Sequence, residues 1–295
     1  MKKIKVAIVQ HACSHSYEEN LKAGIDGVKK AAAQGVDLVL LPELSMGRYF
    51  CITEDPGNYD LAEPIPGKTT EKLQQAAKEN NIIIVATIFE KRAKGLYHNT
   101  AVVLEKDGSL AGTYRKMHIP DDPGFYEKYY FTPGDQGFKP INTSIGRLGV
   151  LICWDQWYPE GARIMALSGA EILLFPSAIG WEPAEEQQEK DRQRNAWMTI
   201  QRSHAIANNL PVISSNRVGL ESTETDENTA TQFWGSSFIT GQQGEILSEA
   251  TTNDEMLIVA ELDLDRTEEV RRIWPYLRDR RIDQYDGILK RHIDE

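Results

Sequence analysis

Cys153 is the side chain in this sequence best placed to act as a nucleophile. It directly follows the apolar run Leu148–Ile152, and the chain then enters Pro159–Arg163, which is typical of a helix start. A buried strand that ends in a cysteine presents a sulfur at the edge of a sheet, where a pocket can form. Free cysteine is also among the residue types most often buried in cores, so the neighbours of Cys153 decide between a reactive and a structural thiol.

A reactive thiol needs a base, because the thiolate is the nucleophile and an ordinary cysteine has a pKa of about 8.5. None of the six histidines lies in a context typical of cysteine proteases. Glu43 follows the apolar run Val36–Leu41 through Pro42, which places a carboxylate at the end of a second buried strand. Two reactive groups at strand ends can converge on one site, although an acid in this position can also simply face water.

A lysine completes the set of reactive side chains. Lys116 lies among aromatic, basic and apolar residues in Tyr114–Pro120, just before a loop rich in Asp, Pro and Gly. Its ammonium could lie beside a substrate carbonyl there, whereas most lysines are solvated surface residues. Each of the three residues on its own is therefore open to a structural interpretation.

The three motifs together resemble those of the nitrilase, or carbon-nitrogen hydrolase, superfamily. They are Leu41–Ser45, Tyr114–His118 and Ile152–Asp155, and the resemblance extends from Val6–Gln10 to Glu261–Asp263. It implies an α/β fold, a four-layer αββα sandwich with pseudo-twofold halves. It also implies a catalytic triad in which Glu43 is the general base and acid, Lys116 stabilises the oxyanion and Cys153 is the nucleophile.

Two further groups follow from the same resemblance. Glu127, in Gly124–Lys128, matches the accessory glutamate of the superfamily, which hydrogen-bonds the lysine region and helps to hold substrate. The backbone N–H of Trp154 is expected to act with Lys116 as an oxyanion donor. No cofactor is implied, and no metal is expected, because the sequence has no His and Cys pairs at ligand spacing.

Two longer stretches narrow the resemblance. Residues 116–131 and 153–160 are similar to the N-carbamoylputrescine amidohydrolases, a branch of the superfamily that releases putrescine, ammonia and carbon dioxide. The substrate implied is a small cation, with a ureido group at one end of a four-carbon chain and an ammonium at the other. A pocket for it needs an acid at the far end and apolar or aromatic walls.

Glu182 is the acid expected at the far end of that pocket. It follows the strand end Pro176–Ala178, which resembles the position that Glu43 occupies in the first half of the chain. The further candidates for the ammonium are Asp155, Asp121 and Asp122, and the expected wall residues are Tyr49, Tyr130, Trp154 and Trp181. The alternative is that the acidic run Glu182, Glu185, Glu186 and Glu189 is only a solvated surface.

Two other functions remain open at the level of sequence. A hydrolase for an acidic substrate such as β-ureidopropionate would need a basic residue beyond the triad, and Arg194, Arg202 and Arg217 are candidates. A noncatalytic interaction scaffold could use the same sandwich, but the intact Glu43, Lys116 and Cys153 argue against it.

The composition limits the partners and the compartment. A net charge of −11 over 295 residues disfavours nonspecific nucleic-acid binding, which needs clustered Lys and Arg. Three scattered cysteines are too few for a disulfide framework, so a cytoplasmic location is expected. No apolar run approaches the ~18 residues that span a bilayer, so no membrane association is expected.

The order of apolar runs and turn residues predicts alternating strands and helices, as in α/β layered folds. Strands are expected at 4–9, 36–41, 82–89, 100–104, 148–152, 172–175, 212–215, 236–240 and 257–262, and helices at about 17–33, 69–80, 159–167 and 191–208. The segment Gly35–Pro42 resembles Gly169–Pro176, which indicates two pseudo-equivalent halves.

No linker separates these halves, so residues 1–295 are expected to form a single domain. Its tail, about 266–295, mixes aromatic residues with arginines, a composition seen at interfaces. The tail is therefore expected either to pack on its own domain or to lie at the interface of a homo-oligomer, a dimer or larger.

Overall fold

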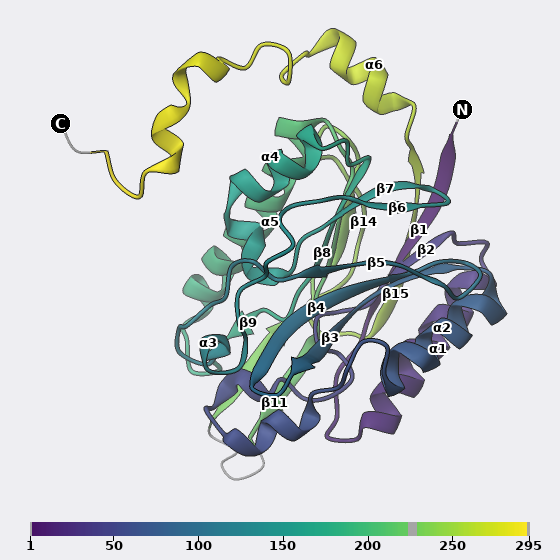
Figure 1. Ribbon diagram of the computed structural model, residues 1–295, viewed down its shortest axis with the longest axis vertical. Helices are drawn as coiled ribbons and strands as arrows, with labels where there is room; N and C mark the ends of the chain where they lie inside the picture. The colour runs from purple at the N-terminus through teal and green to yellow at the C-terminus, as the bar shows by residue number, and fades with distance from the viewer. Residues whose placement is uncertain (1, 224–228, 294–295) are drawn as a thin grey trace.

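Two six-stranded sheets lie face to face in the computed structural model, which describes residues 2–223 and 229–293 (Figure 1). Helices cover the outer face of each sheet, so the molecule has the four-layer αββα arrangement expected from the sequence. A small third sheet, formed by β9 (Gly180–Trp181), β11 (Val218–Ser222) and β12 (Ala230–Trp234), extends one end of the sandwich.

The first sheet has the strand order β15-β1-β2-β3-β4-β5. Its strands are β1 (Lys3–Gln10), β2 (Leu38–Leu40), β3 (Ile83–Ala93), β4 (Leu96–Leu104), β5 (Leu110–Arg115) and β15 (Met256–Asp263). The strands β1, β2 and β3 are parallel to one another, and the remaining pairs are antiparallel. Helices α1 (Tyr17–Ala32) and α2 (Lys68–Asn80) pack on its outer face.

The second sheet has the order β14-β13-β10-β8-β7-β6. Its strands are β6 (Ile141–Thr143), β7 (Gly146–Val150), β8 (Ile172–Pro176), β10 (Val212–Ser215), β13 (Phe238–Thr240) and β14 (Ile246–Glu249). Helices α4 (Pro159–Leu167) and α5 (Gln187–Asn208) cover it. Within the part of the chain that the structure describes, no helix has the length and apolarity to cross a membrane.

Both faces of the central strands are buried, which explains their continuous apolar runs. In β1, Val6 and Ile8 belong to the core between the two sheets, whereas Ala7 and Val9 belong to the core under α1 and α2. The strand β2 alternates in the same way. The period of two along each strand therefore fills two separate cores.

The two halves of the chain repeat one topology. The parallel unit β1-α1-β2-α2-β3 corresponds to β7-α4-β8-α5-β10, and in each half two antiparallel strands follow. The segments Gly35–Pro42 and Gly169–Pro176 contain β2 and β8, which occupy equivalent places in the two sheets. The duplication predicted from their similarity is confirmed.

The predicted elements are present with shifted ends. Helix α5 begins at Gln187, four residues before the expected start, and β2 is confined to Leu38–Leu40. Six strands are absent from the prediction because they are short or contain many polar residues and glycines, so their apolar pattern is weak: β5, β6, β9, β11, β12 and β14.

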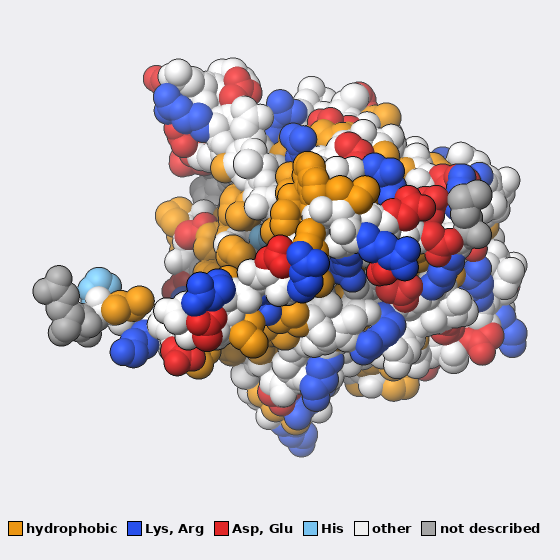
Figure 2. All heavy atoms as spheres, turned by 90° about the horizontal axis from the view of Figure 1, so that it is seen from above, with side chains coloured by type: hydrophobic (Ala, Val, Ile, Leu, Met, Phe, Trp, Pro, Cys, Tyr) orange, Lys and Arg blue, Asp and Glu red, His pale blue; other side chains and the backbone are white. Residues whose placement is uncertain are grey.

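The C-terminal tail leaves the body of the sandwich after β15. It forms α6 (Arg266–Ile273) and two short 3-10 helices, η4 (Ile282–Gln284) and η5 (Asp286–Leu289). Val270 is buried and Arg271 donates a hydrogen bond to the Asn208 carbonyl, but Ile273 is 75% exposed and Leu289 is 90% exposed. Figure 2 shows the tail projecting beside hydrophobic side chains of the body. The first part of the tail thus packs on its own chain, and several apolar side chains farther along it stay exposed.

Candidate active site

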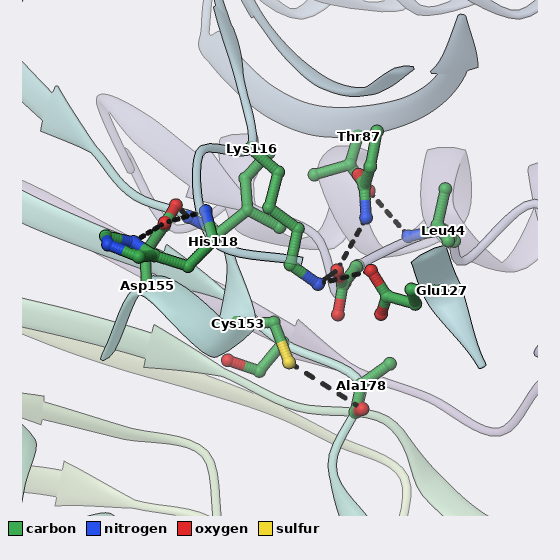
Figure 3. A network of polar contacts seen from close by, with 12 residues as sticks. Leu44, Thr87, Lys116, His118, Glu127, Cys153, Asp155 and Ala178 are labelled. Atoms are coloured by element: carbon green, nitrogen blue, oxygen red, sulfur yellow. Dashed lines mark hydrogen bonds and ion pairs between the residues drawn. The ribbon is translucent and has the colours of Figure 1, made fainter. Parts of the chain in front are cut away.

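Cys153 begins the 3-10 helix η3 (Cys153–Trp157), three residues after the end of β7. Its φ of +44° lies in the left-handed region, which residues with a side chain seldom adopt. This conformation turns the chain sharply from strand to helix. The thiol is buried and lies 3.8 Å from the Ala178 carbonyl oxygen, to which Sγ donates (Figure 3).

Glu43 lies beyond the end of β2, on the other sheet. Its backbone N–H donates to the Ser177 carbonyl at 3.2 Å, which joins the ends of the two pseudo-equivalent segments. The next residue, Leu44, also has a positive φ, +48°, and its N–H donates to Thr87 Oγ1 at 2.5 Å. The turn after Glu43 is therefore held by β3, where Thr87 lies.

Lys116 follows β5 and lies between two carboxylates. Its Nζ is 2.8 Å from Glu43 Oε1 and 2.6 Å from Glu127 Oε2, and all three side chains are fully buried. Glu127 comes from the short helix α3 (Glu127–Tyr130). Figure 3 shows Lys116 reaching toward Glu127 across the space above Cys153. The structure therefore brings together all four residues that the superfamily motifs single out.

Two further side chains complete this group. Asn99 Nδ2 donates to Glu43 Oε1 at 2.7 Å, and the Tyr49 hydroxyl donates to Glu127 Oε1 at 2.6 Å. The second carboxylate oxygen of Glu43, Oε2, is buried and has no hydrogen-bond partner. Glu43 therefore keeps one buried oxygen available to accept a proton.

Burial and the charges of the neighbouring side chains together set the protonation of this group. Burial, followed by the negative charge of Glu43, raises the pKa of the Cys153 thiol well above its ordinary value, and Lys116 opposes the shift. Burial also raises the pKa of Glu127, to about 7. For Lys116, burial lowers the pKa, but attraction to Glu127 and Glu43 outweighs it, so the net pKa lies well above the ordinary value. The resting group thus contains a neutral thiol and a charged ammonium.

This arrangement can support nucleophilic attack on a carbonyl or a related carbon. A buried thiol needs a base within reach to become a nucleophile, and a buried ammonium can stabilise negative charge that develops on oxygen. The N–H of Trp154, in the first turn of η3, is among the groups that have no acceptor within a helix. No group of three His, Cys, Asp or Glu side chains suited to a metal ion occurs among residues 2–223 and 229–293.

The model of the carbon-nitrogen hydrolase family matches residues 5–272. The chain belongs to the carbon-nitrogen hydrolase family. This hydrolase is 42% identical to the N-carbamoylputrescine amidase of Oryza sativa subsp. japonica, over 97% of this chain and 95% of the relative. It is also 42% identical to the citrullinase of Francisella tularensis, over 99% of this chain and 100% of the relative.

A solved structure supports the same conclusion for the fold. The carbon-nitrogen hydrolase from Helicobacter pylori shares 53% sequence identity, and the two superpose with a TM-score of 0.96 over 99% of this chain and 100% of the other. The αββα sandwich of this hydrolase is thus shared with a solved family member.

Asp155 does not lie where a substrate ligand is expected. Both of its carboxylate oxygens are buried, and each accepts two hydrogen bonds. Oδ2 accepts from the Tyr114 hydroxyl and the Ile152 N–H. Oδ1 accepts from the backbone N–H and the ring of His118 (Figure 3). The His118 ring in turn stacks on Tyr158, with centroids 3.8 Å apart. Asp155 therefore fixes the elbow around Cys153, and its carboxylate is occupied by protein groups and not by substrate.

Two of the expected wall residues have their polar atoms engaged elsewhere. The Tyr130 hydroxyl donates to the Thr53 carbonyl at 2.5 Å, and its ring packs among Phe50, Phe89 and other aromatic residues. The Trp181 indole donates to the Lys190 carbonyl at 2.9 Å and packs near Trp234. Both residues belong to aromatic clusters that support the site from outside.

Tyr49 and Trp154 lie nearer to the reactive group. Tyr49 is buried against Glu127, as described above, so its hydroxyl serves that carboxylate. Trp154 is partly exposed, and its ring meets Trp157 edge-on at 6.4 Å. A cavity of about 370 Å³ adjoins Leu44, Tyr49 and Thr87, but Glu43, Lys116 and Cys153 do not line it.

The acids proposed for the substrate ammonium differ in their surroundings. Glu182 and Asp121 are exposed, so water competes for their charge. Asp122 is partly buried, and its Oδ1 is a buried atom with no hydrogen-bond partner. Burial raises the pKa of Asp122, and the nearby charge of Lys116 opposes the shift. Asp122 is thus the candidate with both an unused oxygen and proximity to the reactive group.

Two of the three arginines considered for an acidic substrate, Arg217 and Arg202, have other partners. Arg217 is fully buried, and both of its terminal nitrogens donate to protein groups. Arg202 is exposed and donates to the Gly244 carbonyl at 2.9 Å. Arg194 is partly exposed on α5.

Sequence reasoning missed Asn99 and Thr87, which hold Glu43 and the turn after it. Each is a polar residue within an apolar strand, β4 and β3 respectively, and both are buried. A buried polar side chain in a strand must find a hydrogen-bond partner, so this interruption is the signal that could have found them.

Replacement of Glu43 by glutamine separates the base from the nucleophile. Glu43→Gln keeps the size of the side chain and can retain the contacts of Oε1, but it removes the acceptor at Oε2. We expect ammonia release from amide or ureido compounds to fall by about 10²- to 10⁴-fold. Cys153 should nevertheless react with iodoacetamide. Burial, the largest cause of the raised pKa of the thiol, is unchanged, and the charge of Glu43, which adds to it, is removed.

Peptide mapping after iodoacetamide treatment and an ammonia assay measure these two properties separately. Cys153→Ser is the matched control and should lose both the label at position 153 and turnover. Near-normal turnover by Glu43→Gln would show that another group acts as the base.

Proposed function

We propose that this carbon-nitrogen hydrolase converts N-carbamoylputrescine to putrescine, ammonia and carbon dioxide, as a step of polyamine synthesis from agmatine in the cytoplasm. The observation that carries the proposal is the buried group of Glu43, Lys116, Glu127 and Cys153 in a chain similar over nearly its whole length to an N-carbamoylputrescine amidase. The three free cysteines are consistent with a reducing compartment.

In the first step, Glu43 removes the proton from Cys153 and the thiolate attacks the ureido carbon. The C–N bond to the terminal nitrogen then breaks, and Glu43 returns the proton so that ammonia leaves. The product is a carbamoyl thioester on Cys153. The unpartnered Oε2 of Glu43 is the oxygen best placed for this proton, because Oε1 already accepts from Lys116 and Asn99.

In the second step, Glu43 takes a proton from water, and the hydroxide attacks the thioester carbon. The C–S bond breaks and Cys153 is reprotonated, which releases a carbamic acid that decomposes to the amine and carbon dioxide. Negative charge develops on the carbonyl oxygen in both steps. Lys116 and the Trp154 N–H are the proposed donors to it, and loss of one such donor typically costs roughly 10² to 10³ in rate.

The relatives leave two substrates to compare, because the N-carbamoylputrescine amidase and the citrullinase are equally similar to this chain. N-carbamoylputrescine is citrulline without its α-carboxylate, so the two molecules share the ureido group, the methylene chain and an ammonium. Citrulline would add a carboxylate that needs a cationic partner. Because Arg217 and Arg202 are engaged elsewhere, we favour the substrate without the carboxylate.

The direct test is to compare kcat/KM for N-carbamoylputrescine, citrulline and β-ureidopropionate. We expect N-carbamoylputrescine to be preferred by at least about 10-fold over each of the others, the equivalent of about 1.4 kcal/mol in transition-state binding. A preference for citrulline would instead make the chain a citrulline hydrolase, and a preference for β-ureidopropionate would assign an acidic substrate.

We further propose that Asp122 binds the substrate ammonium, in place of Glu182. Asp122→Asn should raise KM for N-carbamoylputrescine by about 10- to 100-fold, because a charge-assisted hydrogen bond contributes about 1.5–3 kcal/mol. Hydrolysis of butylurea, which has no ammonium, should change little. The matched variant Glu182→Gln should leave both substrates within about twofold of the wild type, because the Glu182 side chain is exposed. Equal losses for both substrates would give Asp122 a structural role.

We also propose that the exposed tail packs against a second copy of the chain in a homo-oligomer. The apolar residues Ile273, Ile282 and Leu289 are 75%, 70% and 90% exposed, and residues of this kind seldom remain in water in such number within one segment. Light scattering should give at least a dimer for the wild type and a smaller species for Ile282→Asp/Leu289→Asp. A monomeric wild type would contradict this proposal.

A further inference from the structure

The segment from Leu44 to Tyr49 connects two parts of the reactive group. At its start, Leu44 follows Glu43 and is held in the left-handed region. At its end, the Tyr49 hydroxyl donates to Glu127, which contacts Lys116. Any shift of this short segment would therefore displace the base at one end and the partner of the lysine at the other.

Arg217 binds the backbone of this segment from the other half of the molecule. It lies between β10 and β11, and its side chain is fully buried. Its Nη2 donates to the Leu44 carbonyl at 2.8 Å and also to the Gly47 carbonyl. The guanidinium carbon lies 5.4 Å from the centre of the Phe233 ring and 6.0 Å from that of Tyr49, so aromatic faces enclose the cation.

Glu221 of β11 is the charge partner of Arg217 and binds the same segment. Its Oε2 accepts from Arg217 Nη1 at 3.0 Å and from the Tyr49 backbone N–H at 2.7 Å. Its side chain is 1% exposed. Together the two side chains hold three backbone groups of the segment: the Leu44 carbonyl, the Gly47 carbonyl and the Tyr49 N–H.

The pair makes contacts that a role in stability alone does not require. Two charges removed from water carry a large desolvation cost, and well-packed apolar residues often replace a buried ion pair without loss of stability. Arg217 Nε and Glu221 Oε1 are buried without hydrogen-bond partners, which adds to that cost. What apolar residues cannot supply is the set of directed hydrogen bonds to residues 44–49.

We propose that Arg217 and Glu221 form a positioning clamp that sets the placement of Glu43 and, through Tyr49 and Glu127, of Lys116. The clamp touches neither the thiol nor the substrate carbon, so both are positioning residues. This inference rests on the proposed function, because it concerns the same site. It also means that β10 and β11 of the second half fix the reactive residues supplied by the first half.

The test replaces both charges at once, with Arg217→Met/Glu221→Leu, so that no unpaired buried charge remains. We expect the variant to fold, with a melting temperature within a few degrees of the wild type. Its kcat should fall by about 10- to 100-fold and its KM should stay within about twofold, because small displacements of catalytic groups mainly affect the chemical step. The matched control, Lys106→Met/Asp37→Leu, removes an ion pair at the opposite end of β2 and should keep kcat.

A second variant tests the link from the clamp to the lysine. Tyr49→Phe removes only the hydroxyl that donates to Glu127, and it should lower kcat by about 10-fold with little change in KM. An unchanged kcat in this variant, or in a folded Arg217→Met/Glu221→Leu protein, overturns the proposal. Failure of that double variant to fold also overturns it, because the pair would then serve stability.

The result does not depend on the identity of the natural substrate. The ratio of variant to wild-type kcat can be measured on whichever ureido or amide compound the wild type hydrolyses. If N-carbamoylputrescine is not a substrate but the clamp variants still lose kcat on another amide, the substrate assignment fails and the clamp stands. If N-carbamoylputrescine is hydrolysed equally well by all variants, the clamp fails and the function stands.

Discussion

The structure of the site depends on one interaction, the burial of the Lys116 ammonium between the Glu43 and Glu127 carboxylates. A cation removed from water has a desolvation cost of several kcal/mol, which is offset only by close and well-oriented partners. The contacts of 2.8 and 2.6 Å provide them, and Asn99 and Tyr49 bind the same carboxylates. The negative charges of Glu43 and Glu127 raise the pKa of the nearby Cys153 thiol, so the thiolate is disfavoured until its proton has an acceptor.

This requirement explains why the two halves of the chain must come together. Glu43 and Lys116 follow β2 and β5 of the first sheet, whereas Cys153 follows β7 of the second. The hydrogen bond between the Glu43 N–H and the Ser177 carbonyl crosses from one half to the other. The reactive group therefore exists only where the ends of the two sheets meet, and the core between the sheets fixes its dimensions.

The sequence allowed prediction of the sheets, their repeat and the strand ends that carry Glu43 and Cys153, because apolar period and punctuation are local properties. It did not allow prediction of where acids point. Asp155 follows Trp154 in an apparent pocket motif, yet it turns inward to bind Tyr114, His118 and the Ile152 N–H. Glu182 remains in solvent, whereas Asp122 is partly buried. The direction of such side chains depends on contacts with distant strands, which no local pattern contains.

The two left-handed residues of the reactive site, Leu44 and Cys153, show how contacts with other side chains fix the chemistry. Backbone of this kind typically costs about 1–3 kcal/mol for a residue with a side chain, so it persists only where the surroundings hold it. Leu44 is held by Thr87 at its N–H and by Arg217 at its carbonyl, and the elbow at Cys153 is held by Asp155 through the Ile152 N–H. The turn at Leu44 is therefore fixed by side chains from other elements. The turn at Cys153 is fixed by Asp155 of its own helix η3, which Tyr114 and His118 hold in place. The base and the nucleophile consequently cannot relax away from each other independently, which keeps a buried thiol within reach of its base.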